Sequence, residues 1–253
     1  MPDHRGAPAG AVEIIAHRGY STRAPENTAA SIEAAVSAGA DAVEFDLHVT
    51  RDGIPVLFHD ATLDRTTDGY GPLRARSFAE ISSLDAGSWF DDAFADERVP
   101  TLDDVLSRLC GRVGRVYAEV KGYRHEGDLD LMVDLVLARS IEDSTVFISM
   151  DWEALGRMRA RHGTLRIGYI VDKAARAFEG VERAAGDPLA LLDFKASLLL
   201  EEPALARRAQ AAGVDLAVWT VDNPAQATHL LALGVHRITT NRVTELLEWR
   251  DGL

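Results

Sequence analysis

Short apolar segments alternate with longer amphipathic segments along almost the whole chain, and this alternation restricts the possible folds most strongly. Parallel strands need a connection about as long as a helix, so strand–helix alternation indicates a parallel sheet with helices outside it. Eight such units in a chain of 253 residues predict an α/β fold of the TIM (β/α)8 barrel type, with residues 1–253 as one domain. The predicted strands are Val12–Ala16, Ala42–Asp46, Val116–Val120, Thr145–Ser149, Arg166–Ile170, Leu191–Lys195, Leu216–Thr220 and His236–Thr239.

One stretch interrupts the alternation after the second strand. Leu47–Thr50 continues that strand past the barrel, and Arg51–Gly53 is typical of a turn. We predict that Ile54–Phe58 runs back antiparallel, so that this hairpin returns His59 to the barrel. The residues from Asp60 to about Pro100 are rich in Asp, Gly and Thr. They are predicted to form a small insertion after the hairpin, beside the opening of the barrel.

Capping patterns mark the ends of several predicted helices. Asn27 is predicted to cap a helix that ends before Gly39. Thr101, with Asp104 three residues later, forms a capping-box pattern at the start of another helix.

The charge and composition limit the partners and the compartment. The formal net charge is −13, which repels nucleic acid and anionic lipid, so no nucleic-acid partner is expected. No apolar run reaches membrane-spanning length, so no stable membrane insertion is expected. Residues 1–10 lack the apolar stretch of a signal peptide, and the single cysteine, Cys110, is expected to pack in the core. These features favour a cytoplasmic protein and leave its oligomeric state open.

Acidic residues end two of the predicted strands. Glu44 and Asp46 are two residues apart and therefore share one face of their strand. Glu119 and Lys121 repeat this spacing on the next barrel strand. Three carboxylates at one rim repel each other unless a hard divalent cation binds them. The alternative is a salt-bridged rim in which Arg18 and Lys121 neutralise the acids, and the spacing leaves both interpretations open.

Two histidines are candidates for acid–base chemistry. His17 ends the first strand and His59 ends the return hairpin, so both are predicted at the barrel opening. Imidazole both accepts and donates protons near neutral pH, as cleavage of a phosphodiester requires. His48 lies on the rising strand of the hairpin and is expected to face solvent. The tripeptide His4–Gly6 repeats the residues at His17 but follows no strand, so we assign it no role.

Cationic and aromatic residues accompany these histidines. Arg18 can bind two phosphate oxygens at once, and Lys121 supplies a point charge. Trp219, at the end of the seventh strand, is predicted either to pack in the barrel core or to form an apolar wall against the substrate.

The ordered motifs resemble those of the glycerophosphodiester phosphodiesterases. They are dense from about residue 14 to residue 121 and sparse beyond it, and their order and spacing make the set specific. The motifs are His17-Arg18-Gly19, Ala24-Pro25-Glu26-Asn27-Thr28, Gly39-Ala40-Asp41, Glu44-Phe45-Asp46, Thr50-Arg51-Asp52-Gly53, Val56-Leu57-Phe58-His59-Asp60, Leu63-Asp64-Arg65-Thr66-Thr67, Pro100-Thr101-Leu102, Glu119-Val120-Lys121 and Val218-Trp219-Thr220-Val221.

The resemblance implies hydrolysis of a small glycerophosphodiester to glycerol 3-phosphate and an alcohol such as choline or ethanolamine. It implies attack by the neighbouring glycerol hydroxyl to give a cyclic phosphate, which water then opens. It also implies one divalent metal ion, Ca²⁺ or Mg²⁺. The implied roles are catalysis by His17 and His59, metal binding by Glu44, Asp46 and Glu119, and phosphate binding by Arg18 and Lys121.

Two strand ends depart from the family pattern. Ile148-Ser149-Met150-Asp151 stands where the family often has Ser-Phe. Thr239-Thr240-Asn241-Arg242 stands where an Asp and a following Pro are usual. We expect these departures to affect substrate shape more than the catalytic set.

Two other functions compete with this interpretation. Related barrels have phospholipase D-like activity on lysophospholipids or sphingomyelin, which requires an apolar groove for the lipid chain. Trp89, Phe90 and Phe94 of the insertion either line such a groove or pack the insertion. The second competitor is a barrel that binds phosphate ligands without catalysis, which would be expected to lack one of the histidines or acids.

Overall fold

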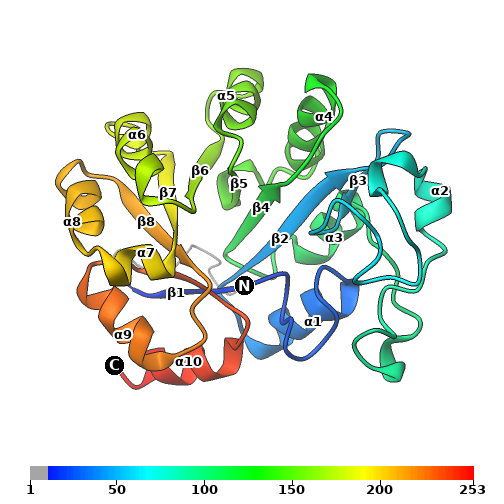
Figure 1. Ribbon diagram of the computed structural model, residues 1–253, viewed down its shortest axis with the longest axis horizontal. Helices are drawn as coiled ribbons and strands as arrows, with labels where there is room; N and C mark the ends of the chain where they lie inside the picture. Colours follow the sequence, from blue (N-terminus) through cyan, green and yellow to red (C-terminus); the bar gives the residue numbers. More distant parts are fainter. Residues whose placement is uncertain (1–10) are drawn as a thin grey trace.

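Hydrogen bonds between β1 and β2 close a sheet of eight parallel strands into a barrel in the computed structural model, which describes residues 11–253. The helices surround these strands (Figure 1). The predicted TIM barrel is confirmed, and His4–Gly6 lies outside the described residues. In order around the barrel, the strands are β1 (Glu13–Ala16), β2 (Ala42–Val49), β4 (Arg115–Val120), β5 (Thr145–Ser149), β6 (Arg166–Val171), β7 (Ala190–Lys195), β8 (Asp215–Trp219) and β9 (Arg237–Thr240).

The outer ring consists of helices that follow the strands along the chain. Their apolar faces and the outward-facing side chains of the strands form the main hydrophobic core. The helices are α1 (Ala29–Ala38), α3 (Leu102–Leu109), α4 (Glu126–Leu137), α5 (Trp152–Arg161), α6 (Ala174–Ala184), α7 (Ala196–Glu201), α8 (Ala204–Ala211), α9 (Pro224–Ala232) and α10 (Val243–Asp251), with a short 3₁₀ helix η3 (Glu142–Ser144).

Inward-facing side chains fill the barrel below its opening. Tyr117, Ile148 and Ile170 belong to this inner cluster, and all three are buried. Because side chains alternate between the two faces of a strand, Glu44 and Asp46 point inward on β2, whereas Phe45 packs against the helices. The packed interior therefore leaves the polar strand ends at the opening as the place for chemistry.

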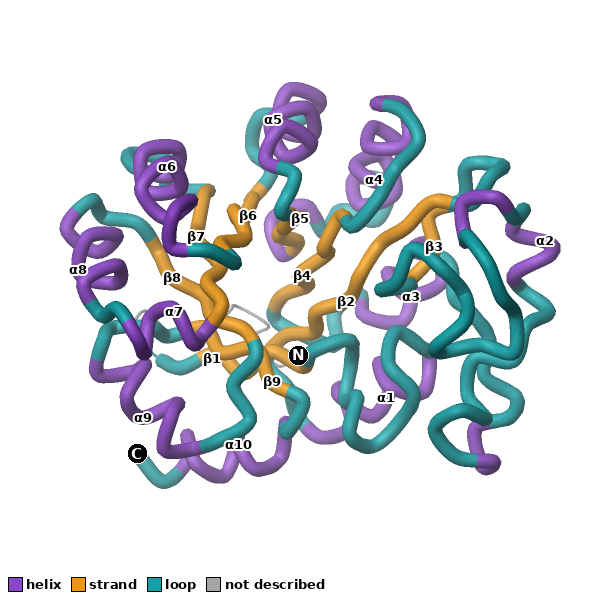
Figure 2. Tube along the Cα trace, in the orientation of Figure 1, coloured by secondary structure: helices purple, strands orange, loops and turns teal. Residues whose placement is uncertain are grey.

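The predicted hairpin and insertion are both present. β3 (Pro55–Leu57) pairs antiparallel with β2, with His48 opposite Val56. The chain after β3 is mostly loop and lies to one side of the barrel (Figure 2). It contains η1 (Leu73–Ala75), α2 (Phe78–Ile81) and η2 (Asp92–Phe94). A small hydrophobic cluster of its own, separate from the main core, is formed by Val56, Phe58, Leu63, Leu73, Ile81, Ala86 and Val99.

Two local predictions are wrong. Thr28, and not Asn27, caps α1, because Thr28 accepts the backbone N–H of Ser31. Asn27 instead has a positive φ of 57° and turns its side chain toward the barrel. Cys110 is exposed and does not pack in the core. The predicted cap at Thr101 and the helix end at Gly39 are confirmed.

Among residues 11–253, no helix combines the length and apolar character needed to cross a membrane.

Candidate active site

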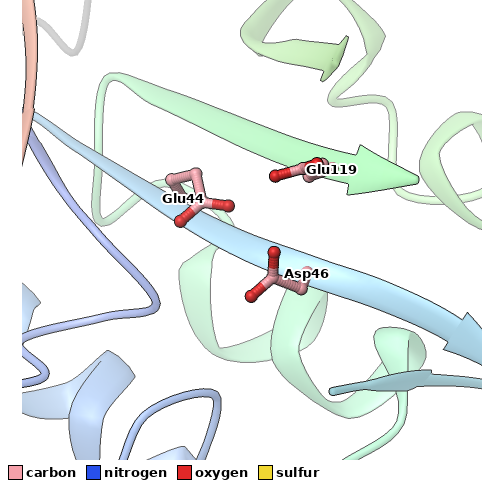
Figure 3. Close-up of side chains that lie close together, drawn as sticks. All are labelled: Glu44, Asp46 and Glu119. Carbon is pink, nitrogen blue, oxygen red and sulfur yellow. The ribbon is translucent and has the colours of Figure 1, made fainter. Parts of the chain in front are cut away.

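Three carboxylates converge at the C-terminal ends of β2 and β4. Glu44 and Asp46 lie on β2, and Asp46 is the direct neighbour of Glu119 on β4. One oxygen from each lies within 4.8 Å of the others, and all three residues are buried. Figure 3 shows them on the same side of the two strands. The spacing of two residues therefore placed these acids correctly.

The neighbouring cations neutralise this cluster only in part. Arg18 Nε lies 3.1 Å from Asp46 Oδ2, and Lys121 Nζ lies 2.8 Å from Glu119 Oε1 and 3.4 Å from Asp46 Oδ1. These are the ion pairs of the salt-bridged alternative, and they do form. Within residues 11–253, however, Glu44 accepts only the backbone N–H of Arg18 at 2.9 Å, and its buried Oε1 has no hydrogen-bond partner there.

The residual negative charge changes the ionisation of the three acids. Burial raises the pKa of Glu44 well above its usual range, and repulsion from Asp46 and Glu119 adds to this effect. Burial and the charge of Asp46 raise the pKa of Glu119 to about 7. Burial also opposes ionisation of Asp46, but Arg18 and Lys121 outweigh it and lower the pKa of Asp46.

This arrangement fits a hard divalent cation. Glu44 Oε1 and Asp46 Oδ1 are buried oxygens that accept no hydrogen bond from residues 11–253, although Lys121 Nζ lies 3.4 Å from Asp46 Oδ1. Both oxygens belong to carboxylates beside that of Glu119. Carboxylate oxygens are the ligands that Ca²⁺ and Mg²⁺ prefer. A bound dication would compensate the charge that Arg18 and Lys121 leave uncompensated, so the donor set and the charge both fit the predicted metal.

His17 is held in one tautomer by Asn241. The Nδ1–H of His17 donates to Asn241 Oδ1 at 2.8 Å, and the Asn241 amide is fixed because its Nδ2 donates to Asp222 at 2.8 Å. Nε2 of His17 is therefore the nitrogen with a free lone pair. Burial and the charge of Arg18 lower the pKa of His17 to about 4, so its ring is neutral at pH 7. Asn241, which departs from the family pattern, thus contacts a catalytic candidate directly.

His59 is oriented by a carboxylate. Its Nδ1–H donates to Asp60 Oδ1 at 2.5 Å, so Nε2 is the ring nitrogen outside this contact. Arg65 of the insertion donates to Asp60 at 2.7 Å and to Glu26 at 2.7 and 2.9 Å. Glu26 also accepts from Arg18 at 2.8 Å. The insertion therefore links the carboxylate behind His59 to the arginine beside the acids.

The prediction for His48 is wrong. His48 follows Asp46 by two residues on β2 and so lies on the same face. It is half-buried, and its Nε2–H donates to the backbone carbonyl of His59 at 3.1 Å. This bond ties the hairpin strand to the segment that carries His59.

A pocket opens at the carboxylate cluster, where Glu44 and Glu119 line it. Arg18, Lys121 and both histidines line its polar part. Trp219, Ile148 and Ile170 line an apolar part. Trp219 also packs against the inner cluster of the barrel, so it takes both of its predicted positions. The candidate residues on the barrel and on the hairpin therefore meet in one pocket.

Sequence reasoning missed four polar residues of this site. Asp193 lies on β7, lines the pocket and is buried, and burial together with Glu119 raises its pKa well above the usual range. Asn27 holds Asp46 with hydrogen bonds of 2.8 and 3.1 Å. Asp193 could have been found by the spacing rule, since it precedes the strand end at Lys195 by two residues. The other three residues, Asn27, Arg65 and Asn241, contact residues far away in the sequence, so no local spacing pattern indicates them.

Comparison with known proteins establishes the family. The model of the glycerophosphoryl diester phosphodiesterase family matches residues 17–245. A glycerophosphodiester phosphodiesterase of Caldanaerobacter subterraneus is 31% identical over 231 residues, which cover 90% of this chain and 93% of that protein. The chain belongs to the glycerophosphoryl diester phosphodiesterase family and is an enzyme that hydrolyses glycerophosphodiesters.

Solved structures agree with this assignment. The crystal structure of a glycerophosphodiester phosphodiesterase from Agrobacterium tumefaciens is 31% identical, has a TM-score of 0.78, and covers 92% of this chain and 97% of that one. An Oleispira antarctica phosphodiesterase was solved in complex with the product sn-glycerol-3-phosphate. It is 29% identical with a TM-score of 0.80, and the match covers 96% of this chain and 98% of that one.

The Asn241 contact generates a prediction about the charge of His17. In Asn241→Asp a carboxylate faces Nδ1 and stabilises the protonated ring, so the pKa of His17 should rise above its value of about 4. A titration of the His17 ring followed by NMR should show a rise of roughly one unit or more. Asn223→Asp adds the same charge one loop away and retains the cap of α9, so it serves as the control. An unchanged titration of His17 in Asn241→Asp contradicts the assigned contact.

Proposed function

We propose that this enzyme cleaves glycerophosphodiesters to glycerol 3-phosphate and an alcohol by two-histidine acid–base catalysis that depends on one divalent cation. The observation that carries the proposal is the different environment of the two histidines in one pocket. His17 faces an amide and His59 faces a carboxylate, and both line the pocket above the three acids. Groups in contrasting environments suit opposite proton-transfer roles.

His17 suits the role of the base in the first step. Its ring is neutral at pH 7, and Asn241 leaves Nε2 free to accept a proton. The Asp60 carboxylate balances the positive charge of a protonated His59, which suits His59 to donate a proton to the leaving alcohol.

Arg18, Lys121 and Trp219 suit the binding of the substrate. The two cations line the polar part of the pocket beside the acids, where a phosphate would lie. Trp219 offers an apolar wall for the carbon atoms of the glycerol moiety. A cation held by Glu44, Asp46 and Glu119 would lower the pKa of a bound hydroxyl and stabilise negative charge on phosphate oxygens.

The proton transfers balance over two steps. His17 takes the proton of the glycerol 2-hydroxyl as that oxygen bonds to phosphorus, and His59 protonates the alcohol oxygen as its bond to phosphorus breaks. In the second step His59 takes a proton from water, the water oxygen bonds to phosphorus, and His17 returns its proton to the 2-oxygen as the cyclic phosphate opens. Both imidazole rings thus return to the protonation states in which they began.

The geometry does not favour the lysophospholipid alternative. Trp89 and Phe94 each pack edge-to-face against Phe90, with ring centroids 5.8 and 5.6 Å apart. The indole N–H of Trp89 donates to the backbone carbonyl of Ala86. These aromatic side chains therefore pack against one another in the insertion, with Trp89 partly open to solvent, and the catalytic pocket is lined by other residues.

The proposed metal site predicts tight binding of a divalent cation. Glu44→Gln removes one carboxylate ligand and should weaken Ca²⁺ or Mg²⁺ binding at least about tenfold, as measured by isothermal titration calorimetry. Its metal-free thermal stability should not fall, because the buried Glu44 carboxylate pairs with neither Arg18 nor Lys121. Glu33→Gln, at an exposed ion pair with Arg112, is the control. Equal affinities in the wild type and Glu44→Gln, or full activity after exhaustive chelation, contradict the metal site.

The proposed roles of the histidines predict losses in turnover. His17→Ala and His59→Ala should each lower kcat by roughly 100-fold or more, because each removes a proton-transfer group. KM should change less, since Arg18 and Lys121 remain. The exposed His229 lies outside the pocket, so His229→Ala should leave kcat unchanged. Near-normal turnover in either of the first two variants removes that histidine from the mechanism.

The internal nucleophile predicts dependence on the glycerol 2-hydroxyl. A bound neighbouring hydroxyl is favoured over water by an effective molarity that reaches about 10⁵ M or more in good geometries. Glycerophosphocholine and its 2-deoxy analogue should therefore bind similarly, because the phosphate contacts are the same, but the analogue should turn over far more slowly. Equal kcat values would show that water attacks phosphorus directly.

A further inference from the structure

A second opening adjoins the catalytic pocket. It lies between the end of β2, the start of the insertion and the loop after β4, and Lys121 lines both openings. His48 lines the second opening, and His59 lines the catalytic pocket. The ring of His48 donates a hydrogen bond to the backbone carbonyl of His59, so the two openings are neighbours. We call this second opening the side groove. The side groove therefore begins beside His59, the residue proposed to protonate the leaving alcohol.

The charged side chains that line the side groove differ in sign from most of those in the chain. The whole chain carries 40 acidic and 27 basic residues. The groove is lined by the cations Arg74, Lys121 and Arg124, and no Asp or Glu of residues 11–253 is among its lining residues. Local positive charge in an acidic protein favours an anionic ligand at this place.

Arg74 is the cation of the side groove that remains available. Lys121 is paired with Asp46 and Glu119. Arg124 is held by Asp128 at 2.6 Å and by a backbone carbonyl. Arg74 is exposed and forms no ion pair within residues 11–253, whereas Arg76, two residues later, pairs with Glu80.

The position of the side groove suits the alcohol half of the diester and not the glycerol half. The apolar wall formed by Trp219, Ile148 and Ile170 belongs to the catalytic pocket and suits glycerol carbons. The side groove lies on the side of His48 and the His59 carbonyl, where the leaving oxygen departs in the proposed mechanism.

We propose that the side groove binds the alcohol moiety of the diester and that Arg74 selects alcohols that carry a negatively charged group, such as a carboxylate or a second phosphate. The proposal rests on the hydrolytic function proposed above. A quaternary ammonium is recognised by several aromatic faces or by acids. The groove offers one aromatic residue, Tyr123, and three cations, so it disfavours choline.

The test compares two substrates that differ by one phosphate, glycerophosphoinositol 4-phosphate and glycerophosphoinositol, with glycerophosphocholine as a third. The wild type should have a higher kcat/KM for the phosphorylated substrate than for its unphosphorylated partner. Arg74→Met should lower this ratio by about threefold to tenfold, the range for one charge-assisted contact at a partly exposed site. Arg74→Glu should reverse the preference and raise kcat/KM for glycerophosphocholine, while Arg74→Lys should retain most of the ratio.

Arg76→Met is the matched control, because it removes a cation from the same insertion outside the side groove, and it should leave the ratio unchanged. A ratio that is the same in the wild type, Arg74→Met and Arg74→Glu overturns the assignment of Arg74. A wild type that prefers glycerophosphocholine to the phosphorylated inositol ester also overturns it. A wild type that cleaves none of the three substrates would instead refute the proposed hydrolysis itself, so the two failures are distinguishable.

Discussion

The structure of the site depends on an imbalance of buried charge. Three carboxylates share one rim of the barrel, and two cations, Arg18 and Lys121, lie among them. Burial forbids a third unpaired anion at neutral pH unless a positive charge joins it or a proton neutralises it. Around this cluster, Asn27 fixes Asp46, and the Arg18 N–H fixes one oxygen of Glu44. The surrounding polar contacts thus hold the acids in place for a cation and a phosphate.

The barrel and the main site residues could be predicted because they follow short-range rules. Strand–helix alternation located all eight barrel strands, since the hydrophobic pattern of each element is local. The spacing of two residues placed Glu44 with Asp46, and adjacent strands brought Glu119 to them. The same spacing puts His48 on the face of Asp46, and the structure shows its ring bonded to the His59 carbonyl and not free in solvent.

The remaining site residues are beyond such rules because they act between distant parts of the chain. Asn241 meets His17 across 224 positions, and Arg65 meets Glu26 across 39. A residue such as Asn27 also resembles an ordinary helix cap in the sequence, and only its backbone conformation in the fold shows otherwise. Contacts of this kind depend on the path of loops, which hydrophobic periodicity does not specify.

The separate hydrophobic cluster of the insertion has a consequence for how this enzyme can change over evolution. Arg74 and Arg65 are both carried by a segment whose small core is distinct from that of the barrel. Replacements on the groove side of this segment would alter substrate preference without disturbing barrel packing, provided that Arg65 retains its hydrogen bonds to Asp60 and Glu26. New substrate specificities can therefore arise on an unchanged barrel. The contacts of Arg65 limit which sequence changes the insertion can accept.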